Sequence, residues 1–122
     1  MDYSSPIPQI DEKLGVHVKN SVGLSQHGFL HFNTPSETSS EDCTPLLKEG
    51  HCVRMELDLD STPRTLQFFV NGKAGKVYMS GIPSSVRIGF SVVEQETSFR
   101  IDNISRLSRP TPISERTRGK KW

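Results

Sequence analysis

Histidine and cysteine side chains at three positions could ligate a metal ion. His27 and His31 are expected to share one face of a strand, and Cys52 follows further along the chain. A structural zinc site needs four ligands, and neither C-x-x-C nor H-E-x-x-H spacing occurs in this sequence. We therefore expect no metal or other cofactor, and we expect these histidines to be exposed strand residues.

Hydroxyl and carboxylate side chains raise the question of hydrolytic chemistry. Ser25 and His27 lie close together, but the chain has no G-x-S-x-G turn that would expose a nucleophilic serine. Asp58 and Asp60 fall on one face of a strand, as a glycosidase pair would. Solvated carboxylates at a strand end are the simpler interpretation. We expect a protein that is not an enzyme and has no small-molecule substrate.

The elements that position these side chains are predicted to be strands. The 122-residue chain has nine valines, seven isoleucines and eight threonines against a single alanine. Alanine favours helices, whereas β-branched residues favour strands. The composition therefore predicts an all-β protein with no helical bundle.

A strictly alternating segment is the clearest strand. In Val53–Leu59 every odd-numbered residue is apolar and every even-numbered residue is charged. Alternation with a period of two predicts a strand with the apolar side chains inside and the charged ones in water.

A hairpin is predicted directly afterwards. Thr65–Val70 has strand composition and is followed by Asn71-Gly72, with a return strand expected at Lys76–Met79. Asn-Gly favours a type I′ turn because both residues tolerate a positive φ. Phe68 and Phe69 should point to opposite faces, one of them into the core. Further strands are expected at Gly15–Lys19, Ser21–Ser25, Gly28–Asn33, Val86–Val93 and Ser98–Asp102.

Three segments have little strand character. Residues 1–13 are a polar lead-in, 34–45 have almost no apolar content and predict an acidic surface loop, and 105–122 predict a disordered basic tail. The first 60 residues carry ten acidic and four basic side chains, and the other 62 carry four acidic and eleven basic ones. Only the tail has any case for binding nucleic acid.

Cysteine usage and hydropathy bear on the location of the protein. No signal peptide and no apolar run of about 18 residues are visible in the sequence, so we expect no membrane span. Cys43 and Cys52 are then expected to be free thiols in a reducing compartment. The sequence predicts a cytoplasmic protein.

The segment around the predicted hairpin resembles the SPRY domain family. That family has an alternating strand with an aspartate-containing turn, as in Leu57-Asp58-Leu59-Asp60. A strand of pattern T-[LI]-x-F-x-x-N-G follows, as in Thr65–Gly72. Gly50, Ser21-Val22-Gly23 and Val86–Val93 also match, so that the resemblance spans about residues 14–104.

The resemblance implies a fold and a function. The fold would be a bent antiparallel β-sandwich of the concanavalin A-like type, and the function would be non-catalytic protein–protein interaction, as in adaptors. Partners would bind through loops at one edge of the sandwich. The chain departs from the family pattern at His51, where aspartate is usual. It also has a shorter segment before Ser21 than family members have, so we expect the N-terminal strands to be missing. Exposed strand edges would then allow a strand-exchanged homo-oligomer.

Partner-binding residues carried over from the family fall in two places. His31, Phe32 and Asn33 end one strand, and Val93, Glu94 and Gln95 follow another. One SPRY subgroup binds Asn-rich peptides through an aromatic residue where this chain has Glu94, which predicts a different specificity here. Ordinary strand-end and loop residues are the alternative interpretation of all six.

Two alternatives to a protein-binding module remain open. The same sandwich architecture is found in carbohydrate-binding lectins, although the loops of this chain are poor in the aromatic residues that stack on sugar rings. A truncated fragment without an independent function is the other alternative.

Overall fold

The computed structural model describes residues 19–89, 100–101 and 103–122. Several predictions fall outside these residues: the lead-in 1–13, almost all of the strand Gly15–Lys19, and most of the strands Val86–Val93 and Ser98–Asp102. The described part of Val86–Val93, residues 86–89, is not in a strand. No partner for it lies among the described residues, so the strand prediction is wrong for these four residues.

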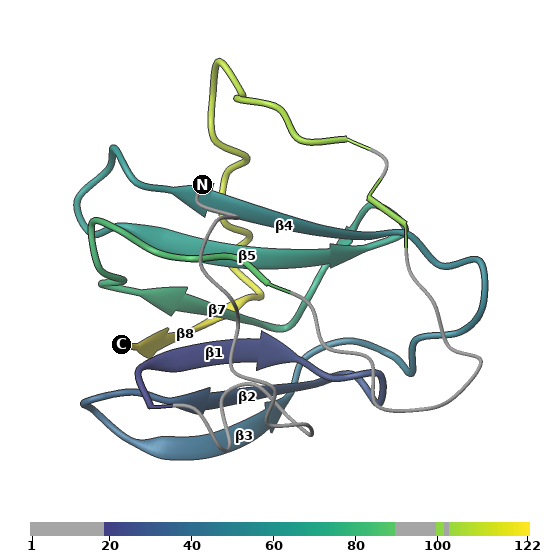
Figure 1. The fold of residues 1–122 in the computed structure, drawn as a ribbon, viewed down its shortest axis with the longest axis horizontal. Helices are drawn as coiled ribbons and strands as arrows, with labels where there is room; N and C mark the ends of the chain where they lie inside the picture. Colours follow the sequence, from purple (N-terminus) through teal and green to yellow (C-terminus); the bar gives the residue numbers. More distant parts are fainter. Residues whose placement is uncertain (1–18, 90–99, 102) are drawn as a thin grey trace.

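Two β-sheets make up the described part of the chain, in which there is no helix and hence none that could cross a membrane (Figure 1). The first sheet has the order β1-β2-β3, and the second has the order β4-β5-β7-β8, with β6 also paired to β5. The all-β prediction is confirmed. The strands are β1 (Ser21–Leu24), β2 (Phe29–Asn33), β3 (Thr38–Asp42), β4 (Val53–Asp58), β5 (Thr65–Val70), β6 (Lys73–Ala74), β7 (Val77–Ser80) and β8 (Arg118–Lys121).

The predicted hairpin forms, but its return strand is in two pieces: β6 directly after the turn, and β7 at Val77–Ser80 instead of Lys76–Met79. Strand β5 has the predicted bounds, and Val70 pairs with Lys73 across a two-residue turn. Asn71 has φ 49° and Gly72 has φ 82°. Both central residues thus adopt the positive φ that a type I′ turn requires, which is why Asn-Gly was a dependable signal.

Strand β4 forms where alternation predicted it, but Glu56 on its charged face is not in water. Glu56 is 8% exposed, whereas Val53 is 44% exposed. The carboxylate of Glu56 accepts hydrogen bonds from the backbone N–H of Thr111 and, at 2.7 Å, from the Thr111 hydroxyl. The Gln67 side chain on β5 donates to the Thr111 carbonyl at 3.1 Å. A distant segment therefore covers the face that local alternation assigned to solvent.

The predicted loop over residues 34–45 is wrong for its centre, which forms β3. This strand pairs with β2 along its whole length, from Phe29↔Asp42 to Asn33↔Thr38. Thr34 N–H donates to the Glu37 carbonyl at 3.0 Å and closes the intervening turn. Main-chain pairing needs no apolar side chains, and a polar outer strand is a common way to protect a sheet edge.

The predicted disordered tail is also wrong at its end, where β8 pairs in parallel with β7. Arg118 N–H donates to the Lys76 carbonyl and Trp122 N–H to the Ser80 carbonyl, both at 2.8 Å. The sheet is therefore mixed rather than purely antiparallel. This pairing could not be predicted from the sequence, because β7 and β8 are far apart in the chain and no local pattern indicates such a distant partner.

The hydrophobic core joins the two sheets. Phe68 points into it, while Phe69 lies on the opposite face under the Arg54 guanidinium, 4.1 Å from its ring centroid. The two phenylalanines thus face opposite sides as predicted. The buried core residues are Leu30 and Phe32 from β2, Leu66 and Phe68 from β5, Val77 and Met79 from β7, and Cys43 and Ile82.

Both cysteines are free thiols, as the sequence predicted, but only one is accessible. Cys43 is buried, its thiol donates to the Val77 carbonyl at 3.5 Å, and burial raises its pKa. Cys52 is exposed. The thiolate is the reactive form, and burial disfavours it at Cys43. The protein therefore has to open locally around Cys43 before this thiol can react.

We therefore expect iodoacetamide to alkylate Cys52 at least about 10-fold faster than Cys43 in the folded protein. Mass spectrometry of timed samples measures both rates. Cys52→Ser should remove the fast phase, and Cys43→Ser should retain it. Equal rates at the two thiols in the native protein would contradict the burial of Cys43.

Candidate interaction surface

Of the three predicted partner-binding residues that the structure describes, two are buried and one is half-buried. His31 is 8% exposed with its ring 6.3 Å from the Phe29 ring, and Phe32 is fully buried in the core. Asn33 is half-buried and accepts a hydrogen bond from the Thr38 hydroxyl at 2.9 Å. Phe32 lies on the face of β2 that packs into the core, with Leu30, and therefore has no exposed surface. The other three predicted residues, Val93, Glu94 and Gln95, lie outside the described residues.

The three described histidines lie in different surroundings. The expectation of exposed strand histidines fails for His31, which is buried, and His27 lies in the turn before β2. His51 accepts a hydrogen bond from the Lys48 N–H at 3.1 Å through Nδ1. Within the ranges that the structure describes, no group of three or more His, Cys, Asp or Glu side chains could hold a metal ion.

The carboxylates of Asp58 and Asp60 serve different purposes. Asp58 accepts hydrogen bonds from the N–H groups of Asp60 and Ser61 at 3.2 and 3.1 Å. The side chain of Ser61 and then these N–H groups lower the pKa of Asp58. Asp60 is exposed and lies 3.8 Å from Arg106. Asp58 therefore shapes the β4–β5 turn, whereas Asp60 pairs loosely with Arg106.

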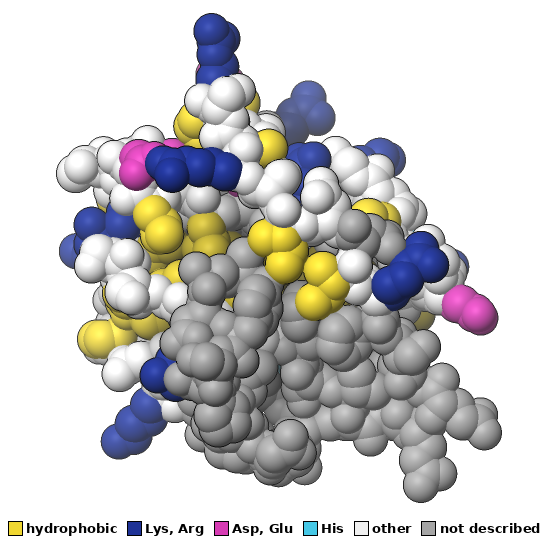
Figure 2. All heavy atoms as spheres, turned by 45° about the horizontal axis from the view of Figure 1, so that its top comes forward, with side chains coloured by type: hydrophobic (Ala, Val, Ile, Leu, Met, Phe, Trp, Pro, Cys, Tyr) yellow, Lys and Arg dark blue, Asp and Glu magenta, His cyan; other side chains and the backbone are white. Residues whose placement is uncertain are grey.

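A shallow groove of about 310 Å³ lies beside this turn. The face above β4, shown in Figure 2, has hydrophobic side chains lying among several Lys and Arg side chains. The residues that line the groove are Asp58, Ser61, Pro63, Thr65, Tyr78, Pro110, Thr111, Pro112 and Ile113.

At the opposite end of the strands, two loops are joined by main-chain hydrogen bonds. The carbonyl of Gly28, in the β1–β2 turn, accepts from the N–H groups of Cys43 and Thr44, each at 2.9 Å. The N–H of Leu47 donates to the Gln26 carbonyl at 2.8 Å. Gly28 has φ +87°, and a Cβ built there would lie 2.0 Å from the Thr44 carbonyl oxygen. Only glycine therefore allows the two loops to approach so closely.

A third loop, the β5–β6 turn, joins the same end of the molecule (Figure 1). Asn71 donates its N–H to the Cys52 carbonyl at 2.8 Å, and its side-chain oxygen accepts from the Cys52 N–H at 2.9 Å. Lys76 N–H donates to the Cys43 carbonyl at 2.8 Å. We call the three fastened loops, residues 25–29, 43–52 and 71–73, the loop end.

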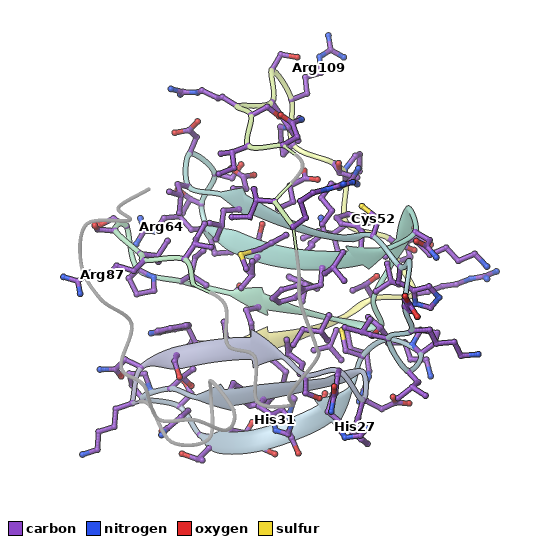
Figure 3. All side chains as sticks on the ribbon, turned by 45° about the vertical axis from the view of Figure 1, so that its right-hand side comes forward. His27, His31, Cys52, Arg64, Arg87 and Arg109 are labelled. Atoms are coloured by element: carbon purple, nitrogen blue, oxygen red, sulfur yellow. The ribbon has the colours of Figure 1, made fainter. Side chains whose placement is uncertain are left out.

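The loop end exposes apolar side chains beside polar ones. Phe29 is 43% exposed and Leu46 is 50% exposed. His27, Lys48 and the half-buried His51 belong to the same loops, and Figure 3 shows His27 at this end of the molecule, beyond His31. Aromatic and aliphatic groups held on rigid loops with polar neighbours are typical of protein-binding surfaces.

Sequence reasoning did not single out the loop end. Gly28 and Gly50 marked turns in the sequence, but nothing local pairs residue 26 with residue 47. The contacts between the loops form because the two sheets place the loops that connect their strands at one end of the molecule. The signal that could have helped is Phe29, an aromatic residue on the opposite strand face from Leu30 and Phe32.

Neither a protein-family model, nor a curated protein, nor a solved structure matches this chain.

Proposed function

We propose that this chain is a non-catalytic interaction module of SPRY type, which binds a protein or peptide partner in the cytoplasm through its loop end. The observation that carries the proposal is the fastening of three loops by main-chain hydrogen bonds, with Phe29 and Leu46 exposed on them. Such loops lose little conformational freedom on binding, and preorganisation of this kind favours affinity.

The local structure of the family-like segment supports the SPRY part of this proposal. Thr65–Gly72 forms the strand and the tight turn that the family pattern implies. Two sheets sharing one hydrophobic core are compatible with a bent sandwich. The non-catalytic part is supported by Asp58, whose carboxylate is occupied by turn N–H groups.

The proposal is tested by comparing partners captured by matched variants of the full chain. Phe29→Asp with Leu46→Asp places charges on the loop end, whereas Leu59→Asp changes a residue of similar exposure at the other end of β4. Losing a central apolar contact in an interface commonly costs about 2 kcal/mol, or roughly 30-fold in Kd. We expect quantitative mass spectrometry to show partners retained by wild type and Leu59→Asp but lost by the double variant.

As a control, thermal unfolding of all three proteins is measured to check that both variants are folded. Partners retained equally by the double variant would contradict the proposed surface. Binding of the wild type to a glycan array, lost in the double variant, would instead indicate a carbohydrate-binding module.

A further inference from the structure

Strand β8 is attached to the edge of β7 in the way that interaction domains bind extended peptides. Its four residues pair in parallel with β7, from Val77↔Arg118 to Ser80↔Lys121. Hydrogen bonds from Arg118 N–H and Trp122 N–H anchor the two ends of the strand. Adding a strand to an exposed sheet edge supplies affinity through main-chain bonds and specificity through side-chain pockets.

The β8 strand contributes little to the core. Arg118, Gly119 and Lys121 are exposed, and only Lys120 is half-buried within the strand. The following Trp122 packs partly buried against the core cluster. The strand is thus held mainly by its backbone and its charges, unlike β5, whose side chains are buried along most of its length.

The cations of β8 meet acidic side chains from the other sheet. Arg118 Nη2 lies 3.3 Å from Glu41 Oε2 on β3. Lys120 Nζ lies 3.3 Å from Glu37 Oε1 and 3.4 Å from Glu41 Oε1. Hydrogen bonds to these glutamates raise the pKa of Lys120. The two carboxylates therefore select positive charge at two strand positions separated by one residue.

The residue between the two cations is also specified. Gly119 lies against Tyr78, and a Cβ built on it would be 2.8 Å from the tyrosine hydroxyl oxygen. A side chain there would push against the Tyr78 ring, whereas glycine lets the strand approach. Glycine is therefore the residue that fits between the two cations without a shift of the Tyr78 side chain.

We propose that the β7 edge, with Glu37, Glu41 and Tyr78, is a binding site for an extended basic peptide of Arg-Gly-Lys type in a partner protein. The chain's own residues 118–122 occupy this site in cis and compete with the partner. Phe29 and Leu46, which carry the proposal for the loop end, are not part of this site, so each proposal is tested by its own variants.

Competition by a tethered segment sets the size of the expected effect. A segment on a short flexible connection has an effective concentration on the order of millimolar. It therefore raises the apparent Kd of a free peptide that competes for the same site. Six residues, 112–117, connect Thr111, which is hydrogen-bonded to Glu56, to the bound segment. Removing the cis occupant should therefore strengthen binding of a free peptide roughly 10- to 100-fold.

The test uses the full chain and a fluorescein-labelled peptide with the sequence of residues 114–122. Arg118→Glu with Lys120→Glu sets like charges against Glu37 and Glu41 and releases β8. Arg116→Glu with Lys121→Glu makes the same charge change at two exposed positions of the same segment. We expect fluorescence anisotropy to give roughly 10- to 100-fold tighter peptide binding by the first variant than by wild type or the second.

Peptide variants test the recognition itself. A peptide with Val at the position of Gly119, or with Glu at those of Arg118 and Lys120, should bind the opened protein at least about 10-fold more weakly. If the charge-reversed chain does not fold, Gly119→Val in the full chain releases β8 by steric conflict and replaces it in the same assay.

Three results would overturn the proposal. The first is equal peptide binding by wild type and the opened variant. The second is that the opened variant binds the valine-containing peptide as tightly as the glycine-containing one. The third is dimerisation of the wild type that the opened variant loses. The last of these, seen by light scattering, would make a second copy of the chain the occupant. Retention of peptide binding by the Phe29→Asp, Leu46→Asp protein would confirm that this site is independent of the loop end.

Discussion

Replacing Phe32 by alanine should strongly lower the thermal stability of the protein. The side chain is fully buried in the core shared by the two sheets. Removing a buried phenylalanine ring costs about 3–5 kcal/mol, because burial is lost and a cavity remains. The whole free energy of unfolding of a domain is about 5–15 kcal/mol. Scanning calorimetry or circular dichroism should show Tm lowered by roughly 10–20 °C.

Phe29 provides the matched control for this experiment. It has the same residue type on the same strand, but its side chain points to the other face and is 43% exposed. We expect Phe29→Ala to cost less than about 1 kcal/mol. Similar shifts of Tm for the two variants would show that β2 does not place Phe32 in the core.

Gly28→Ala should have the second large effect. The residue has φ +87°, and the new Cβ would lie 2.0 Å from the Thr44 carbonyl oxygen and 2.8 Å from that of Pro45. Both are backbone atoms and cannot rotate away, so the β1–β2 turn would have to separate from the β3–β4 loop. We expect a loss of roughly 3–5 kcal/mol in the free energy of unfolding, measured by urea denaturation.

Gly50→Ala separates the clash from the backbone strain. Gly50 has φ +83°, but a Cβ there would meet no atom within 4 Å. Only the cost of the left-handed conformation remains, about 1–2 kcal/mol. Comparable losses for Gly28→Ala and Gly50→Ala would mean that the close approach of the two loops does not limit stability.

The accuracy of sequence-based prediction depended on whether the partner of a segment was close in the chain. Strand β5 and its Asn71-Gly72 turn were predictable because the strand pattern and the turn chemistry are both local. Strands β3 and β8 were missed, since their polar side chains gave no hydrophobic pattern and their stability comes from main-chain pairing. The burial of Glu56 was equally hidden, because it depends on Thr111.

The candidate site shows the same limit. The mapping onto His31, Phe32 and Asn33 followed a family pattern, whereas the alternation within β2 already set Phe32 on the same face as Leu30. Treating Phe32 as a core residue needed only that alternation. The hydrogen bonds between residues 26 and 47 and between residues 52 and 71 could not be predicted from local sequence. They depend on how the two sheets place the loops that connect their strands.

The parallel pairing of β7 with β8 also has a consequence for the order of events during protein synthesis. On the ribosome, β7 emerges well before β8, whereas each antiparallel hairpin, such as β2–β3, has its two strands available almost together. For that interval the nascent chain carries an unpaired β7 edge next to the uncompensated carboxylates of Glu37 and Glu41. Translation proceeds at about 5–20 residues per second, so this interval lasts on the order of seconds. Chaperones and neighbouring nascent chains would meet the β7 edge before the protein covers it.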